Sequence, residues 1–217
     1  MTSQAVPSRV PAGRLSDAFA FACEVHANQV RKGTNIPYIA HLMGVASLAL
    51  EHGADDDTAV AALLHDAPED QGGLPMLERI RSRFGADVAK IVEGCTDTFE
   101  NPKPNWTVRK TAYIGHLQHS DFKVCLVAAA DKVHNARAIL HDLNNIGPDV
   151  FKRFSASAEQ TGWYYGGVAR VLHQRLAGTD AIALAGALYH AIHEIASHKG
   201  GEAFRLGAER GRRGDAC

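Results

Sequence analysis

Residues 61–70 of the chain read AALLHDAPED, and this segment carries the clearest signal for both fold and chemistry. An apolar run ends in the pair His65 and Asp66, and two further carboxylates follow at Glu69 and Asp70. Because residues three and four apart share one side of a helix, the second pair of acids is expected near the first. An imidazole beside a carboxylate is suited to holding a divalent metal ion. Taken alone, the segment is also typical of a helix end with solvated acids, so the rest of the chain must supply the context.

Pro68 lies inside this segment and limits its conformation. Proline has no amide hydrogen, and its ring clashes with the preceding turn of a helix. The helix that leads to His65 and Asp66 must therefore kink or end at this point. This is a local cost at the place where ligands must be aimed, and a simple helix end is the alternative interpretation.

The composition is that of one globular domain. The chain has 217 residues, and 46% of them are hydrophobic, which is enough to form a core. A net charge of -1 provides no global attraction for nucleic acid or an anionic membrane, so neither is expected as a partner. The first residues lack the apolar middle of a signal peptide, and the four cysteines form no CxxC pair, which favours reduced thiols and a cytoplasmic location. The sequence does not predict the oligomeric state.

Apolar residues recur at helical spacing along most of the chain and no persuasive strand pattern occurs, which predicts an all-α fold. We expect one bundle of about 8–10 helices over residues 14–198. A flexible arm at residues 1–13 and a flexible tail at residues 199–217 are expected to flank it. The expected helices cover residues 15–30, 38–52, 55–67, 74–84, 87–95, 106–120, 122–143, 155–176 and 179–198.

Asp131 lies in the second informative segment, at residues 122–143. Residues 124–130 are apolar almost all round, which indicates a central, buried helix. A buried carboxylate is costly unless it is paired or bound to a metal, so Asp131 is a candidate ligand, with a buried salt bridge or cap as the alternative. His41, in the first turn of another expected helix, is a further candidate, although a lone histidine there is commonly structural.

The candidate ligands come from three expected helices and offer only nitrogen and oxygen donors, a set that suits Mn, Fe, Mg or Zn. They are His41, His65, Asp66 and Asp131. A metal held by them would lower the pKa of water and offset the charge of a phosphate, which favours hydrolysis without a covalent nucleophile. Glu69 and Asp70 are placed to take a proton from the water or to return one to the leaving group.

Basic residues could bind further phosphate groups. Arg31 and Lys32 end the first expected helix, where a solvated charge pair favoured by the helix dipole is the alternative interpretation. Arg109 and Lys110 project from the helix expected at residues 106–120, and plain helix surface is the alternative for them. Asn135 lies one turn after the buried carboxylate and could donate to the motif or to a ligand.

Three segments in this order resemble the RelA/SpoT-type hydrolase domain of the HD-domain metal phosphohydrolases. They are RKGTNIPYIAH at residues 31–41, LLHDAPED at residues 63–70 and ADKVHNARAI at residues 130–139. The resemblance extends over residues 15–176. It implies an all-helical fold, a Mn-dependent site and removal of pyrophosphate from the ribose 3′ position of ppGpp or pppGpp, giving GDP or GTP. Because no synthetase domain fits in the chain, it resembles a stand-alone small alarmone hydrolase.

The resemblance also implies roles for individual residues. The metal ligands would be His41, His65, Asp66 and Asp131, and the catalytic acidic pair would be Glu69 and Asp70. The residues near the nucleotide would be Arg31, Lys32, Asn135 and Tyr164.

Two positions depart from the family pattern. Pro68 replaces a small or aliphatic residue, and Ala138 stands where many members have a hydroxyl residue near the nucleotide. The alternatives that stay open are adenosine alarmones such as ppApp, the 2′-phosphate of NADPH, another nucleotide hydrolysed by an HD domain, and a domain that binds nucleotide without catalysis.

Overall fold

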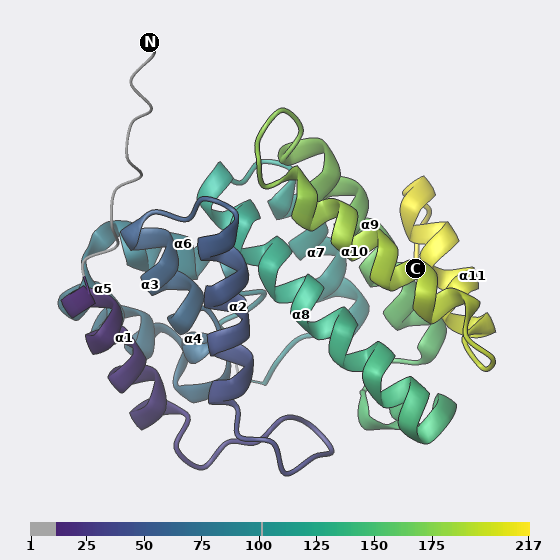
Figure 1. Cartoon of the computed structure of the whole chain (residues 1–217), viewed down its shortest axis with the longest axis horizontal. Coiled ribbons are helices and arrows are strands. Elements are labelled where there is room, and N and C mark those ends of the chain that lie inside the picture. The colour runs from purple at the N-terminus through teal and green to yellow at the C-terminus, as the bar shows by residue number, and fades with distance from the viewer. Residues whose placement is uncertain (1–11, 101) are drawn as a thin grey trace.

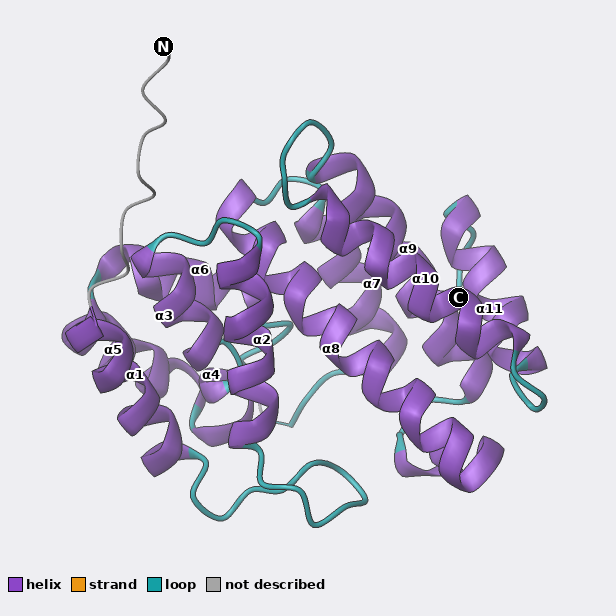
Figure 2. Ribbon diagram, in the orientation of Figure 1, coloured by secondary structure: helices purple, strands orange, loops and turns teal. Residues whose placement is uncertain are grey.

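The computed structural model describes residues 12–100 and 102–217, and within these ranges the chain forms helices and no β-strand (Figure 2). The expected all-α class is confirmed. The helices are α1 (Ala12–Val25), α2 (Ile39–Glu51), α3 (Asp56–Leu64), α4 (Ala67–Gln71), α5 (Gly73–Phe84), α6 (Ala86–Cys95), α7 (Trp106–Leu117), α8 (Phe122–Ile146), the 3₁₀-helix η1 (Gly147–Arg153), α9 (Ala158–Arg175), α10 (Ile182–Ser197) and α11 (Glu202–Arg213). Most of the arm expected at residues 1–13 lies outside the described residues.

Helix α8 runs through the middle of the bundle (Figure 1). It packs against α2, α3 and α6, which precede it in the chain, and against α9 and α10, which follow it. All residues from Val124 to Asp131 are buried, because a helix that is apolar all round has to be covered on every face. The central position predicted for this helix is confirmed, and it carries Asp131 into the interior.

The motif segment lies where one helix ends and the next begins. Asp55 caps the start of α3, because its carboxylate accepts a hydrogen bond from the Thr58 amide at 3.0 Å, and the helix ends at Leu64. Pro68 lies in the first turn of α4, where a missing amide hydrogen costs no hydrogen bond. The helix expected to continue to residue 67 is therefore two helices, and His65 and Asp66 occupy the break between them.

The first expected helix, at residues 15–30, is wrong at its end, since α1 stops at Val25. The backbone instead turns back on itself. The Arg31 amide donates to the Ile36 carbonyl at 2.8 Å, and the Tyr38 amide donates to the Gln29 carbonyl at 2.9 Å. These bonds need extended backbone, so a helix cannot continue through them. The other expected helices begin and end within three residues of the observed ones.

The C-terminal segment differs most from the expected flexible tail at residues 199–217, because it forms α11 and packs along α9. Phe204 is fully buried in this contact. Much of the contact is made by backbone. A Cβ built on Gly207 would lie 1.8 Å from the Glu159 carbonyl oxygen, and one on Gly211 would lie 2.0 Å from that of Trp163. Glycine is thus required on α11 by close approach.

Replacing Gly207 by alanine should therefore force α9 and α11 apart. Overpacking a tight contact typically costs about 1–3 kcal/mol, which we expect as the loss in free energy of unfolding measured with urea. Gly186 in α10 is the matched control, since a Cβ built there meets no described atom within 4 Å. Gly186→Ala should leave stability unchanged or raise it by up to about 1 kcal/mol through helix propensity. Equal effects of the two substitutions would contradict the close contact.

Candidate active site

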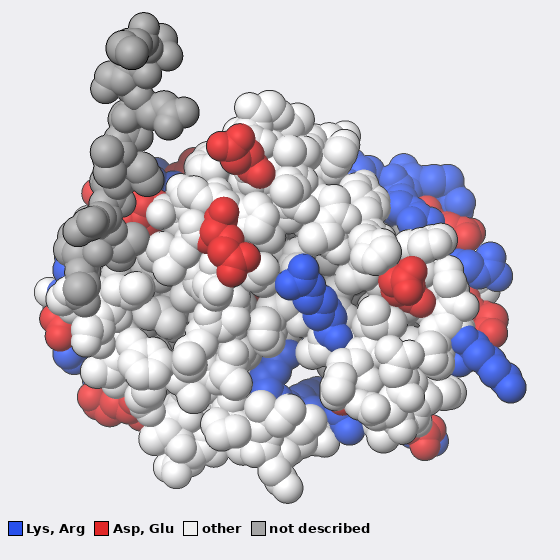
Figure 3. Space-filling view, viewed as in Figure 1, with Lys and Arg blue, Asp and Glu red and all other residues white. Residues whose placement is uncertain are grey.

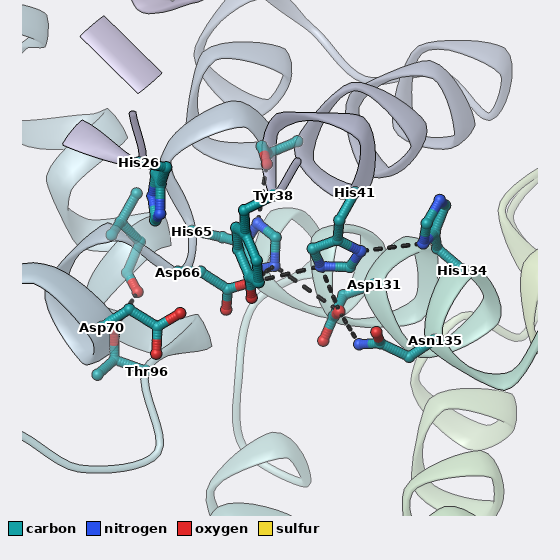
Figure 4. A network of polar contacts seen from close by, with 12 residues as sticks. His26, Tyr38, His41, His65, Asp66, Asp70, Thr96, Asp131, His134 and Asn135 are labelled. Atoms are coloured by element: carbon teal, nitrogen blue, oxygen red, sulfur yellow. Dashed lines mark hydrogen bonds and ion pairs between the residues drawn. The ribbon is translucent and has the colours of Figure 1, made fainter. Parts of the chain in front are cut away.

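All four predicted ligands come together in one cluster (Figure 4). His41 lies in the first turn of α2, His65 and Asp66 lie in the break before α4, and Asp131 lies in the middle of α8. The His41 Nε2 atom is 3.4 Å from Asp66 Oδ2 and 3.3 Å from Asp131 Oδ1. The His65 Nε2 atom is 3.1 Å and 3.7 Å from the same two oxygens.

The cluster fits a divalent cation. The Nε2 atoms of His41 and His65 are buried and have no hydrogen-bond partner among the described residues, which is unusual for buried polar atoms. Two such nitrogens and two carboxylates face one another, a donor set suited to Mn, Fe, Mg or Zn. Burial lowers the pKa of His65, but the charges of Asp66 and Asp131 outweigh burial and raise that pKa well above its usual value. The centre of the cluster therefore favours positive charge.

Surrounding side chains hold the four residues in place. The His65 Nδ1 atom lies 2.8 Å from the Ala62 carbonyl oxygen. The Tyr38 hydroxyl donates to Asp66 Oδ2 at 2.6 Å. The carboxylate of Asp131 accepts from the side chains of both Lys132 and Asn135.

Tyr38, Lys132 and His134 were not predicted as site residues, although each lies inside one of the three motif segments. Their position three residues or fewer from a candidate ligand was the available signal. Burial, the neighbouring His41 and Arg31 lower the pKa of His134 to about 4, so this ring is neutral at physiological pH.

Glu69 and Asp70 lie in the first turn of α4 and line a pocket next to the cluster. Glu69 pairs with Lys103 at 2.9 Å. Burial and the charge of Asp97 raise the pKa of Glu69, although Lys110 and Lys103 oppose this shift. Asp70 is open to the pocket, but the pocket walls desolvate it in part, and with the charge of Asp66 this raises its pKa as well. Both acids are suited to exchange protons closer to neutral pH than free carboxyl groups.

The loop between α1 and α2 holds the Asp70 side chain on the side of Gln29. The Gln29 side-chain amide donates to Asp70 Oδ2 at 2.7 Å, while its oxygen lies 2.7 Å from Nδ1 of the buried His26. The His26 ring stacks on Tyr38, with ring centroids 5.1 Å apart. The loop after α1 thus supports Asp70 directly and the candidate ligand Asp66 through Tyr38, contacts that the expected long helix did not suggest.

The pocket has a volume of about 830 Å³, and its walls include both acids, several cations and aromatic rings. Figure 3 shows Lys and Arg side chains around a hollow on the face seen in Figure 1. All four residues predicted to lie near the nucleotide line the pocket: Arg31, Lys32, Asn135 and Tyr164. Arg31 donates to Asn135 Oδ1 at 2.5 Å, and the Tyr164 hydroxyl is buried without a partner among the described residues. Ala138 lines the pocket too.

Arg109 and Lys110 have a structural partner. The Arg109 guanidinium and the Lys110 ammonium each lie 2.5 Å from Asp97 Oδ2. Burial raises the pKa of Asp97, but Lys110 and Arg109 outweigh burial and hold it below its usual value. Lys110 also borders the pocket, whereas Arg109 does not line it. The structure therefore favours the structural interpretation of Arg109.

None of the helices in the described ranges combines the length and apolar character needed to cross a lipid bilayer.

Comparison with known proteins gives consistent matches. The HD domain family matches residues 18–162. A Danio rerio protein named guanosine-3′,5′-bis(diphosphate) 3′-pyrophosphohydrolase MESH1 is 36% identical over 170 residues, covering 77% of this chain and 86% of that protein. The Xenopus tropicalis protein of the same name is 37% identical over 182 residues, covering 82% of this chain and 93% of that protein.

Solved structures agree with the sequence matches. One described as "A metazoan ortholog of SpoT hydrolyzes ppGpp and plays a role in starvation responses" matches with a TM-score of 0.67 and 25% identity, covering 86% of this chain and 98% of that chain. A Listeria monocytogenes structure, lmo0812, matches with a TM-score of 0.59 and 26% identity, covering 69% of this chain and 97% of that chain.

Proposed function

The chain belongs to the HD-domain family that these 3′-pyrophosphohydrolases share, and from this premise we propose that it removes pyrophosphate from the ribose 3′ position of ppGpp and pppGpp, leaving GDP and GTP. One observation carries the proposal: the His-Asp cluster opens into a pocket of about 830 Å³ that also holds two acids and several cations. Such a pocket supplies what hydrolysis of a charged phosphate ester requires.

The cluster would hold a divalent metal through His41, His65, Asp66 and Asp131, and Mn²⁺ is the proposed ion. A divalent ion bound there would lower the pKa of water and offset the negative charge of the phosphate. The chain supplies the alignment of the donors. The Ala62 carbonyl orients His65, and the Tyr38 hydroxyl orients Asp66.

Glu69 and Asp70 carry the protons. Glu69, with its raised pKa, acts as the general base that takes a proton from the attacking water. Asp70, whose pKa is also raised, acts as the general acid that gives a proton to the leaving ribose oxygen. Gln29 holds the Asp70 carboxylate at 2.7 Å and so limits its rotation. Pro68 sits in the first turn of the same short helix, so it fits the segment without displacing either acid from the pocket.

The nucleotide lies between the cations and the aromatic wall. Arg31 and Lys32 bind phosphate groups, and Asn135 ties Arg31 to the helix that bears Asp131. The Tyr164 hydroxyl, which has no hydrogen-bond partner among the described residues, is available to the substrate. We further propose a cytoplasmic location, which the absence of disulfides among the described cysteines supports.

Product analysis tests the function. The Mn²⁺-loaded protein is incubated separately with ppGpp, ppApp and NADPH, because Ala138, which departs from the family pattern, lines the pocket and leaves the choice of base open. Pyrophosphate and GDP are expected from ppGpp, and an Asp66→Ala variant should release neither. Orthophosphate from NADPH alone would replace the proposed substrate, and no product from any compound with metal bound would overturn the activity.

Glu69→Gln should retain bound metal and lower kcat by about 10²- to 10⁴-fold, the range for loss of a general base. The base works in its ionised form, and its pKa is raised, so the wild-type rate should fall on acidification at a pH above the ordinary value of 4.5. Glutamine should remove this acidic limb from the pH profile.

Lys103→Met is the matched control for that limb. The Lys103 ammonium lowers the pKa of Glu69, so its removal should move the limb to higher pH while leaving the plateau rate in place. An unchanged rate in Glu69→Gln would exclude Glu69 from the mechanism.

A further inference from the structure

The two histidines of the cluster are oriented by different kinds of partner. The His65 Nδ1 atom faces the Ala62 carbonyl at 2.8 Å. A carbonyl only accepts hydrogen bonds, so a neutral His65 carries its proton on Nδ1 and keeps the Nε2 lone pair for a metal ion. The His41 Nδ1 atom faces the Nδ1 atom of His134 at 2.9 Å (Figure 4). An imidazole nitrogen either donates or accepts, so this partner does not by itself fix the tautomer of His41.

A single proton lies between the two Nδ1 atoms, and its owner determines whether His41 can bind a metal. If His41 donates, its Nε2 lone pair faces Asp66 and Asp131, which lie 3.4 and 3.3 Å away. If His134 donates, a neutral His41 must carry its proton on Nε2, and that hydrogen occupies the place of the metal. The contact works only when His134 accepts.

We propose that His134 is a positioning residue that accepts the Nδ1 proton of His41 and so holds His41 in the tautomer that binds metal, and that Gly44 is kept free of a side chain to admit the His134 ring. The inference rests on the proposed function in one respect, the assignment of His41 as a ligand.

Gly44 provides the second, independent observation. It lies on α2 one turn after His41, and a Cβ built there would be 2.3 Å from His134 Cδ2 and 2.4 Å from His134 Nε2. Gly44 is not among the glycines with positive φ, so the backbone does not require glycine. Glycine is also a poor helix former. The position of the His134 ring is what explains a glycine in the interior of α2.

The arrangement couples α2 to α8 through the metal site. His134 is three residues after the ligand Asp131 on α8, and Gly44 is three residues after the ligand His41 on α2. Each helix thus contributes one ligand and one part of the support. Partners of metal-bound histidines typically change metal affinity by about 10- to 100-fold when removed.

The first test is Mn²⁺ affinity measured by competition with a chelator, with thermal unfolding of each variant as the check on folding. His134→Leu removes the acceptor and should weaken binding by about 10- to 100-fold. His134→Asn places an amide oxygen near the position of Nδ1 and should restore most of the affinity. Equal affinities of the leucine variant and the wild type would overturn the inference.

His41→Ala separates this inference from the proposed function. Loss of Mn²⁺ in His41→Ala together with wild-type binding in His134→Leu would reject only the role of His134. Retention of Mn²⁺ in His41→Ala would reject the ligand assignment itself.

The second test is a double-mutant cycle on Mn²⁺ affinity. Gly44→Ala should displace the His134 ring and weaken binding, without lowering the unfolding temperature, since alanine favours the helix. In a His134→Ala background there is no ring to displace, so Gly44→Ala should then change affinity by less than about two-fold. An equal loss in both backgrounds would overturn the role given to Gly44.

The third test needs no substitution at the site. In metal-free protein with ¹⁵N-labelled histidine, NMR couplings report which ring nitrogen carries hydrogen. We expect His134 to carry its proton on Nε2 and to leave Nδ1 unprotonated. A proton on Nδ1 of His134 would overturn the inference directly.

Discussion

Replacing Asp131 by alanine is expected to abolish metal binding and to reduce turnover of ppGpp by about 1,000-fold or more, equivalent to about 4 kcal/mol of transition-state stabilisation. Asp131 Oδ1 faces the free nitrogens of both His41 and His65 at 3.3 and 3.7 Å. Its removal takes away one of the four proposed donors and one of the two negative charges that offset the charge of the cation. Metal content and steady-state turnover of the purified variant measure the two effects.

Asp142 supplies the control for that experiment. It lies on the same helix, and its carboxylate pairs with Arg153 at 2.5 Å instead of facing the cluster. Asp142→Ala should keep the metal stoichiometry of the wild type. Full metal content in Asp131→Ala would remove Asp131 from the ligand set.

Replacing Asp97 by alanine is expected to lower the free energy of unfolding by about 3–5 kcal/mol, the typical cost of breaking a buried ion pair from one side. The Asp97 side chain is only 3% exposed, and its partners Arg109 and Lys110 are 12% and 16% exposed. Without the carboxylate, two cations remain desolvated and unpaired at the start of α7. Urea unfolding monitored by circular dichroism measures the loss.

The pH dependence of this contribution has a definite sign. The folded-state pKa of Asp97 is lowered, so its stabilisation is fully present above the ordinary value of 3.8 and is lost as the pH falls through the lowered value. Wild type and variant should converge in stability only under strongly acidic conditions. Asp149 is a surface control, since its pair with Lys152 is 65% and 80% exposed, and Asp149→Ala should change stability by less than about 1 kcal/mol. A comparable loss of stability in both variants would contradict a stabilising role for the buried ion pairs of Asp97 with Arg109 and Lys110.

Several features follow from the sequence because local physics fixes them. The 3.6-residue spacing of apolar side chains predicts the helices, and an all-round apolar run predicts that α8 is central. Pro68 cannot lie in the interior of a helix, which places the break at the His-Asp pair. The cost of burying a carboxylate without a partner singles out Asp131.

Other features depend on contacts between distant segments, and no local pattern encodes them. The end of α1 is set by backbone pairing between residues 29–31 and 36–38, which competes with helix propensity over the same residues. Helix α11 is held by glycines that allow backbone contact with α9, and its sparse apolar residues look like those of a tail. Asp97 is separated from its two cations by a loop without periodicity.

By itself, the sequence of this protein determined its helical class and its central helix, because periodicity predicts both, and it singled out Asp131 through the cost of burying charge. His41, His65 and Asp66 were recognised because they lie in motif segments that resemble a known family. Only the tertiary structure decided which atoms orient them: His134 against His41, room for that ring at Gly44, and Gln29 behind Asp70. Such choices depend on how closely two helices approach, and that distance is a property of the packed chain rather than of any single segment.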